Sequence, residues 1–232
     1  MTQDRLSDLK QFYRLIDRAI SKVNGAYFLS ECHGRMDWPQ RGVYFFFETG
    51  EERAQSGTGL RVVRVGTHAV STGSRTKLWD RLRQHKGCAV HGGGNHRGSV
   101  FRKVIGSALL ARDPELHCVS WGIGANAPRE VRNAEHDMER IVSHHIQSMP
   151  FVWLRVDDEP DPNSMRAYIE RNSIALLSNW GRHGEGIIDP PTGGWLGRSC
   201  PCERVRDSGL WNSNHVSEDY DPGFLSVLES CI

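Results

Sequence analysis

The stretch RGVYFFFETGEERAQSGTGLRVVRVGTH, residues 41–68, contains two short apolar segments separated by a polar loop with three glycines. Along residues 42–48 the side chains alternate between the two sides of the backbone, which is typical of a strand. A second strand is expected at residues 60–67. Because two strands joined by a polar, glycine-containing loop most simply pair with each other, the stretch predicts an antiparallel hairpin. We expect one face of this hairpin to be buried, and that face contains Val43, Phe45, Phe47, Val63 and Val65.

The rest of the chain combines helical patterns with two further strand-like segments. Helices are expected at residues 4–23, 76–86, 99–112, 130–149 and 164–179, and strands at residues 116–121 and 151–156. From residue 181 onward the chain is rich in Gly, Pro, Ser and Asn, which indicates a long irregular segment packed on the domain. We therefore predict an α+β fold in which a small antiparallel sheet, the hairpin plus a third strand, is flanked by helices.

Composition and length favour an ordinary globular protein. The chain has 232 residues, of which 38% are hydrophobic and 25% are charged. No apolar run approaches the roughly 18 residues needed to cross a membrane, and the first residues lack the apolar core of a secretory signal. We therefore expect a cytoplasmic protein. Six cysteines without framework spacing do not suggest disulfides, and the sequence SCPC at residues 199–202 leaves zinc binding as a minor alternative.

The net charge of +1 conceals a strongly basic segment. Residues 60–112 contain eleven lysines and arginines but a single acidic residue, Asp80. Such a local excess in a nearly neutral protein is expected of a surface that binds phosphate groups. An ordinary solvated surface is the alternative, because charge alone does not identify a partner. Within this segment Lys77, Arg81 and His85 follow at four-residue steps, so they form one basic stripe on an expected helix.

Several short motifs occur in an order that resembles the GIY-YIG nuclease superfamily. GVY at residues 42–44 resembles the first motif of the family, and RVG at residues 64–66 occupies the place of the second. LWDRLRQH at residues 78–85 resembles the helix that follows, and IERN at residues 169–172 resembles the late helix with its metal-binding glutamate. The resemblance divides the chain into an N-terminal helix and lead-in, a nuclease domain with an insertion, and an irregular C-terminal extension. These parts span residues 1–41, 42–180 with the insertion at about 113–150, and 181–232.

The resemblance implies a metal-dependent endonuclease that hydrolyses phosphodiester bonds in DNA. This reaction needs a deprotonated and aimed water, a cation on the phosphate and often a divalent metal. By this resemblance Tyr44 takes or relays the proton of the water, Arg81 holds the scissile phosphate, and Glu170 holds Mg²⁺ or Mn²⁺. His85, one turn after Arg81, is expected to contact the phosphate or to move a proton. Arg64 is expected to supply further positive charge beside Tyr44.

One departure from the family leaves two interpretations of the activity. The second motif of the family begins with tyrosine, whereas this chain has Arg64 at that position. Either the arginine preserves the chemistry by its charge, or the protein is a catalytically inactive nucleic-acid-binding module of the same fold. In both interpretations further polar side chains contact the nucleic acid, and the expected ones are Lys77, Arg83, Arg97, Arg102 and Asn179.

Two further motifs each leave a competing interpretation open. EHDMERIV at residues 135–142 places Glu139 on another expected helix, so Glu139 competes with Glu170 as the metal ligand. LHCVSWGIGANAPREV at residues 116–131 contains the pattern G-x-G-x-x-A between an expected strand and an expected helix, which resembles a dinucleotide-binding fingerprint. The acidic residue expected for such a site, Asp157, lies farther along the chain than is typical, and only one such unit occurs.

Overall fold

A four-stranded antiparallel sheet forms the centre of the protein, with the strand order β1-β4-β2-β3. The computed structural model describes residues 2–232, except for the side chains of residues 2, 3 and 185. The predicted hairpin is confirmed, because β2 (Gly42–Glu52) pairs with β3 (Leu60–Gly66). The third strand, β4 (Pro150–Arg155), lies on the other side of β2. A two-residue strand that the sequence does not indicate, β1 (Tyr27–Phe28), pairs with β4.

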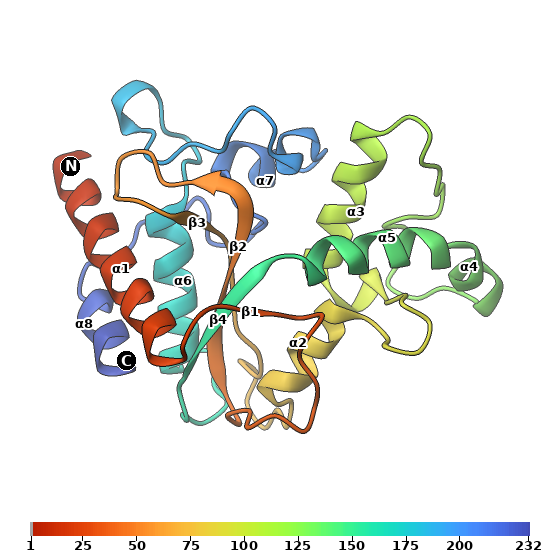
Figure 1. Ribbon diagram of the computed structural model, residues 1–232, viewed down its shortest axis with the longest axis horizontal. Coiled ribbons are helices and arrows are strands. Elements are labelled where there is room, and N and C mark those ends of the chain that lie inside the picture. The colour runs from red at the N-terminus through yellow and green to blue at the C-terminus, as the bar shows by residue number, and fades with distance from the viewer. Residues whose placement is uncertain (1) are drawn as a thin grey trace.

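Helices cover both faces of this sheet (Figure 1). One face is covered by α1 (Thr2–Lys22), α6 (Met165–Leu177) and α8 (Phe224–Ser230). The other face is covered by α2 (Leu78–Lys86), α3 (Val100–Arg112) and α5 (His136–Gln147), with α4 (Arg129–Ala134) beyond α5. The remaining short helices are η1 (His96–Gly98), η2 (Gly184–Gly186), η3 (Leu196–Ser199) and α7 (Glu203–Ser208). The predicted α+β fold is thus confirmed. Within residues 2–232, no helix has both the length and the apolar character that a membrane crossing requires.

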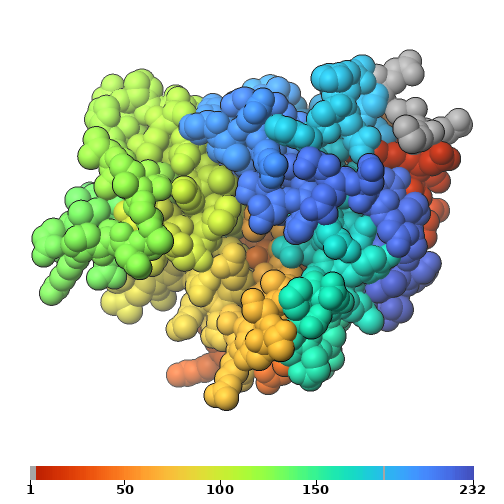
Figure 2. Space-filling view, turned by 180° about the vertical axis from the view of Figure 1, so that it is seen from behind, coloured from red at the N-terminus to blue at the C-terminus, as the bar shows by residue number. Residues whose placement is uncertain are grey.

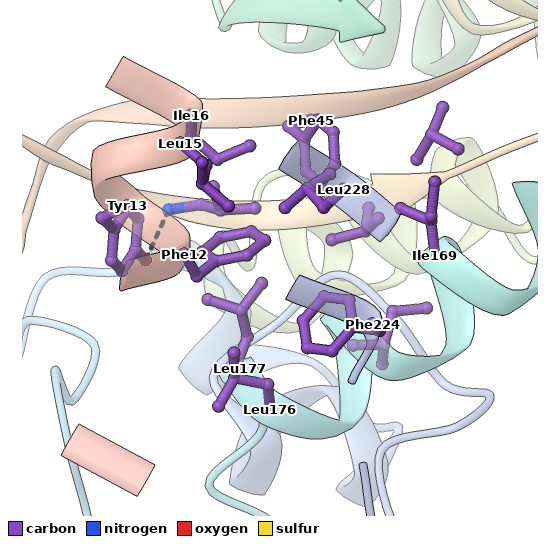
Figure 3. Packing of buried hydrophobic residues seen from close by; sticks show 14 of the residues in the cluster. Phe12, Tyr13, Leu15, Ile16, Phe45, Ile169, Leu176, Leu177, Phe224 and Leu228 are labelled. Carbon is purple, nitrogen blue, oxygen red and sulfur yellow. Dashed lines mark hydrogen bonds between the residues drawn. The ribbon is translucent and has the colours of Figure 1, made fainter. Parts of the chain in front are cut away.

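The core on the α1 side is built from aromatic and branched side chains (Figure 3). Phe12 of α1 packs edge-on against Phe45 of β2, with ring centroids 5.9 Å apart. Phe224 of α8 lies 6.5 Å from the ring of Phe12. The hydroxyl of Tyr13 accepts the N–H of Val62 at 3.1 Å, which ties α1 to β3. Burial of each large apolar side chain of this kind stabilises the folded state by about 1.5–3 kcal/mol. The helices α1 and α8 are therefore integral parts of the fold.

The other face of the hairpin is also buried, and a β-bulge decides which residues it contains. Phe46 pairs with Arg64, whereas the next residue, Phe47, pairs with Val62, so Val63 is an extra residue in β3. Val62 lies in the core on the α1 side, and Val63 lies in the core under α2 and α3. The prediction that Val63 shares a face with Val43, Phe45, Phe47 and Val65 is wrong, because the bulge turns it to the opposite face.

The insertion differs from its predicted secondary structure. Residues 116–121 form turns instead of a strand, and Trp121 anchors them on α3 by donating from Nε1 to the carbonyl of Lys103 at 3.0 Å. The single helix expected at residues 130–149 is two helices, α4 and α5, separated at Glu135. The dinucleotide interpretation is also wrong, because a βαβ unit needs parallel strands and every described strand pair is antiparallel.

The C-terminal extension covers the open edge of β3. The N–H of Trp211 donates to the carbonyl of Val63 at 2.7 Å. The side-chain amide of Asn212 accepts the N–H of Val65 at 3.1 Å and donates to the carbonyl of Val65 at 2.9 Å. These bonds imitate the pairing of a further strand along an edge whose backbone groups would otherwise be unpaired. The irregular extension therefore completes the sheet.

Two glycines of the opening stretch allow close approach. Tyr44 lies opposite Gly66 in the β2–β3 pairing and is 0% exposed. A Cβ at Gly66 would overlap the ring and hydroxyl of Tyr44, so the tyrosine crosses β3 only because no side chain stands there. A Cβ at Gly42 would overlap the carbonyl of Leu154 in β4. Both glycines are therefore required by the packing of the sheet.

Replacement of Gly66 by alanine is expected to lower the free energy of unfolding by about 1–3 kcal/mol, the usual effect of forcing extra atoms into a packed interior. Gly193→Ala is the matched control, because a Cβ at Gly193 meets no atom within 4 Å. Urea unfolding followed by tryptophan fluorescence measures both variants. Equal stability of Gly66→Ala and the wild type would contradict the packing of Tyr44 over β3.

Candidate active site

Tyr44 of β2 and His85 of α2 form a hydrogen-bonded pair inside the protein. The hydroxyl of Tyr44 and Nε2 of His85 are 2.8 Å apart, and both side chains are fully buried. On the other side of the ring, Nδ1 of His85 lies 2.9 Å from Oγ of Ser99. Ser99 is the N-cap of α3 and accepts the N–H of Arg102. A chain of hydrogen bonds therefore connects the start of α3 to the Tyr44 hydroxyl.

His85 is neutral in this environment. Burial lowers the pKa of His85 well below its ordinary value, and the charges of Arg81, Arg64 and Arg102 lower it further. A neutral imidazole has one N–H and one lone-pair nitrogen. In the tautomer in which Oγ of Ser99 donates its own proton to Nδ1, the N–H of Nε2 donates to the oxygen of Tyr44.

Arg64 lies beside Tyr44 on the face of the sheet that α3 covers. Its guanidinium lies over the ring of Phe101, 5.3 Å from the centroid, and is close enough to Tyr44 to interact with it electrostatically. Nη1 donates to the carbonyl of Trp211 at 2.7 Å. Burial lowers the pKa of Arg64, whereas Tyr44 and Glu170 raise it. Its Nε is buried with no hydrogen-bond partner among the described residues, so the protein does not fully satisfy this cation.

Arg81 and Glu170 bring charges to the same end of the sheet from opposite faces. Arg81 is partly buried on α2, and its Nη1 donates to Oε1 of Gln84 at 3.0 Å and to the carbonyl of Gly98 at 3.1 Å. Glu170 of α6 accepts the N–H of Thr67, the residue after β3, at 3.1 Å. Arg81 and Glu170 are close enough to interact electrostatically. Figure 2 shows this face, where yellow, teal and blue segments surround recessed orange atoms of the hairpin.

Glu170 suits a hard divalent cation. Burial raises the pKa of Glu170, while Arg64, His215 and the N–H of Thr67 lower it, so the carboxylate has cationic and hydrogen-bonding support. Among residues 2–232, no group of three or more His, Cys, Asp or Glu side chains is arranged to hold a metal ion. A cation bound here would therefore use one carboxylate together with water and substrate oxygens, which is how Mg²⁺ usually binds. The residues fit magnesium, and the zinc alternative at residues 199–202 has no support.

The C-terminal extension adds a histidine that sequence reasoning missed. His215 adopts a left-handed φ of 61° and contacts Oε1 of Glu218 through Nδ1 at 2.7 Å. It is close enough to Glu170 to interact with it electrostatically, so it lies near the predicted metal ligand. The surrounding residues, from Trp211 to Asp219, have no periodicity or motif that could have identified it.

Three of the five predicted nucleic-acid-binding residues need correction, and Asn179 is the first. Lys77, the N-cap of α2, and Arg83 of α2 are exposed, as expected of residues that bind a nucleic acid. Asn179 is buried, and its amide donates to the carbonyl of Ile188 at 2.9 Å and accepts the N–H of Ile188 at 3.1 Å. It also accepts a bond from Arg5 of α1. Asn179 therefore joins the end of α6 to its neighbours and does not face a ligand.

Arg97 and Arg102 do not face a ligand either, because carboxylates of the insertion pair with both of them. Nη2 of Arg97 donates to Glu135 at 2.7 Å, and Nε of Arg102 donates to Glu139 at 2.9 Å. Glu139 also accepts a hydrogen bond from the backbone N–H of His96, and its Oε1 lies 2.9 Å from Nδ1 of the same histidine. Its oxygens are thus already bonded within the protein, and the geometry does not favour it as a rival metal ligand.

Comparison with known proteins gives a family but no individual relative. A family model described as a GIY-YIG domain matches residues 3–232, which confirms the resemblance in the sequence and extends it to nearly the whole chain. Neither the curated proteins nor the solved structures gave a significant match.

Stability is expected to fall as the pH falls below about 6.5, because folded His85 stays neutral while unfolded histidine takes up a proton near that value. Below it the unfolded state therefore binds more protons than the folded state, and the free energy of unfolding decreases. Urea titrations between about pH 7.5 and 5.5 should show a smaller decrease for His85→Gln than for the wild type. The exposed His117→Gln is the control and should behave as the wild type does. An unchanged pH dependence in His85→Gln would show that another group is responsible.

Proposed function

We infer that this chain, which belongs to the GIY-YIG family, is a metal-dependent endonuclease that hydrolyses phosphodiester bonds in DNA. The observation that supports this best is the 2.8 Å contact between Tyr44 and His85 beside two arginines and one carboxylate. Proteins of the family are typically nucleases and generally use divalent metal ions, so nucleic acid is the expected substrate class.

We assign Arg81 to the scissile phosphate. Its bonds to Gln84 and Gly98 both use Nη1, and no other group of the described chain takes Nε or Nη2. A guanidinium binds two phosphate oxygens at once, a geometry that lysine lacks. Arg64, which lies deeper, adds positive charge near the place where negative charge develops during the attack.

We assign Tyr44 to the attacking water. The N–H of His85 and the charge of Arg64 both stabilise negative charge on the Tyr44 oxygen, so the phenolate can accept a proton from water. The proton then resides on Tyr44, the leaving oxygen takes a proton from solvent as its bond to phosphorus breaks, and Tyr44 later returns its own proton to solvent. Because His85 is held neutral among arginines, its role is to donate a hydrogen bond rather than to store that proton.

We assign Glu170 to the divalent cation, Mg²⁺ or Mn²⁺. When bound, such an ion polarises a phosphate oxygen and stabilises the charge that develops on it. The N–H of Thr67 orients the carboxylate from the end of β3, and the nearby arginines favour its ionised form against the opposing effect of burial.

One observation favours a second candidate function, a nucleic-acid-binding module without cleavage. Tyr44 is 0% exposed, and Arg64 stands where the family has its second tyrosine. If no water reaches the Tyr44 hydroxyl when the nucleic acid is bound, the arginines bind the phosphate groups but the phosphodiester bond is not hydrolysed. Cleavage and binding measured on the same preparation separate the two candidates.

The purified protein is expected to nick plasmid DNA with Mg²⁺ or Mn²⁺ and not in EDTA. Arg81→Ala and Glu170→Gln should each lower the rate by about 100-fold or more, because Arg81 stabilises the charge of the transition state directly and Glu170 holds the cation that does so. The controls are Arg14→Ala and Glu159→Gln at exposed positions, which should cut as the wild type does. Wild-type protein that binds DNA with a steep salt dependence but never cuts it would establish the binding module instead.

Tyr44→Phe keeps the ring that packs over Gly66 and removes only the hydroxyl. The single-turnover cleavage rate is expected to fall by about 10²- to 10⁴-fold, the usual contribution of a general base. DNA affinity measured in EDTA should stay unchanged, because the assigned phosphate contacts do not involve Tyr44. A variant that cleaves at the wild-type rate would exclude Tyr44 as the base.

A further inference from the structure

A pocket beside Arg81 extends the candidate active site along α2. It has a volume of about 630 Å³ and lies between α2 and the loop that connects α2 to η1. Gln84 and Gly98, the two residues that bond Arg81, both line it. The pocket is therefore adjacent to Arg81, the group that we assign to the scissile phosphate, although Arg81 does not itself line it.

The charge of this pocket is positive. Arg83 lines it, is exposed, and has its nearest carboxylate, Asp80, at 4.0 Å, which is beyond hydrogen-bonding distance. Lys86 lines it as well and is positioned by a bond of 2.7 Å to the carbonyl of Cys32. None of the residues given for its lining is Asp or Glu. The charged side chains that line the pocket are therefore cationic, which favours an anion there.

An aromatic ring forms part of the wall. Trp79 is partly buried and lines the pocket, whereas its neighbours Leu78 and Leu82 are fully buried. The ring stacks on Trp38 at 4.9 Å with an interplanar angle of 21°, and Trp153 lies 4.5 Å behind Trp38. A rigidly supported aromatic ring in a cationic groove is the arrangement on which unpaired bases stack.

A second basic pocket continues the first one. It has a volume of about 570 Å³ and shares Gly94 and Asn95 with the first pocket. Arg129 and Arg132 of α4 line it, and both are exposed and form no ion pair within the described chain. The shared loop lies on the buried Arg102, because a Cβ at Gly94 would overlap its guanidinium. The two pockets form one basic track from Arg81 to α4.

We propose, on the basis of the proposed function, that this track binds a single-stranded segment of DNA next to the scissile phosphate. An unpaired base stacks on Trp79, and the backbone phosphates of the strand contact Arg83, Arg129 and Arg132. A base within a duplex is stacked between its neighbours and does not reach a ring in the wall of a pocket. The substrate class is therefore DNA with unpaired nucleotides beside the cleaved bond, such as a flap, an overhang or a junction.

Fluorescence anisotropy in EDTA tests this proposal without any dependence on cleavage. The probes are a labelled duplex with a single-stranded flap and a blunt duplex of the same sequence. The wild type should bind the flap substrate more tightly. Trp79→Ala should weaken flap binding by about 5- to 150-fold, the effect of losing one stacked base, and leave blunt-duplex binding unchanged. The double variant Arg129→Ala/Arg132→Ala should reduce the slope of log K against log salt by about 0.7 per arginine.

The exposed pair Lys10 and Arg14 on α1 provides the matched charge control, and Lys10→Ala/Arg14→Ala should bind both probes as the wild type does. Equal affinity of the wild type for both probes, or flap binding unaffected by Trp79→Ala and by the double arginine variant, would overturn the proposal. If Trp79→Ala does not fold, the double arginine variant decides. Flap-selective binding without cleavage in Mg²⁺ would support the track and refute only the nuclease function.

Discussion

A buried tyrosine hydroxyl must find its hydrogen-bond partners inside the protein, and this requirement organises the whole site. Tyr44 meets it with His85, which in turn needs Ser99 at the start of α3. Arg64 beside it needs the carbonyl of Trp211 from the C-terminal extension. The hairpin, α2, α3 and the extension are therefore joined by polar contacts as well as by apolar packing. Displacing one of these elements would leave a buried donor or acceptor without its partner, and each such group would destabilise the folded state by about 1–3 kcal/mol.

The basic segment at residues 60–112 has two structural roles that its composition does not separate. Part of it, including Arg81 and Arg83, lies at or near the surface. Another part is internal, because Arg61 pairs with Glu51 and Arg102 pairs with Glu139 at buried positions. Breaking a buried pair of this kind typically costs about 3–5 kcal/mol, since the remaining charge stays desolvated. Glu139 of the insertion thus holds α5 against α3. Because several of the cations at residues 60–112 are paired inside the protein, fewer of them are available to bind phosphate than the charge excess indicates.

The sequence was sufficient for features that depend on local patterns. The hairpin and the helices α1, α2, α3 and α6 follow from periodicity. The roles of Tyr44, Arg81 and Glu170, which motif order suggests, stay predictions. The bulge at Val63 and the pairing of the insertion with the basic segment depend on contacts between distant residues. The bond from Arg64 to the Trp211 carbonyl, for example, spans 147 residues. The boundaries drawn at residues 41 and 180 stay a prediction, and α1 and α8 share one core with the hairpin.

The position of the edge-covering segment at the end of the chain has a consequence for synthesis. A ribosome makes the hairpin and α2 long before it makes Trp211 and Asn212, so the nascent chain holds β3 with its outer edge unpaired. Such an edge can pair with another chain, which makes the unfinished protein prone to aggregation. The carbonyl that binds Arg64 is missing during the same interval. Completion of the site and protection of the sheet edge therefore depend on the same two residues, Trp211 and Asn212.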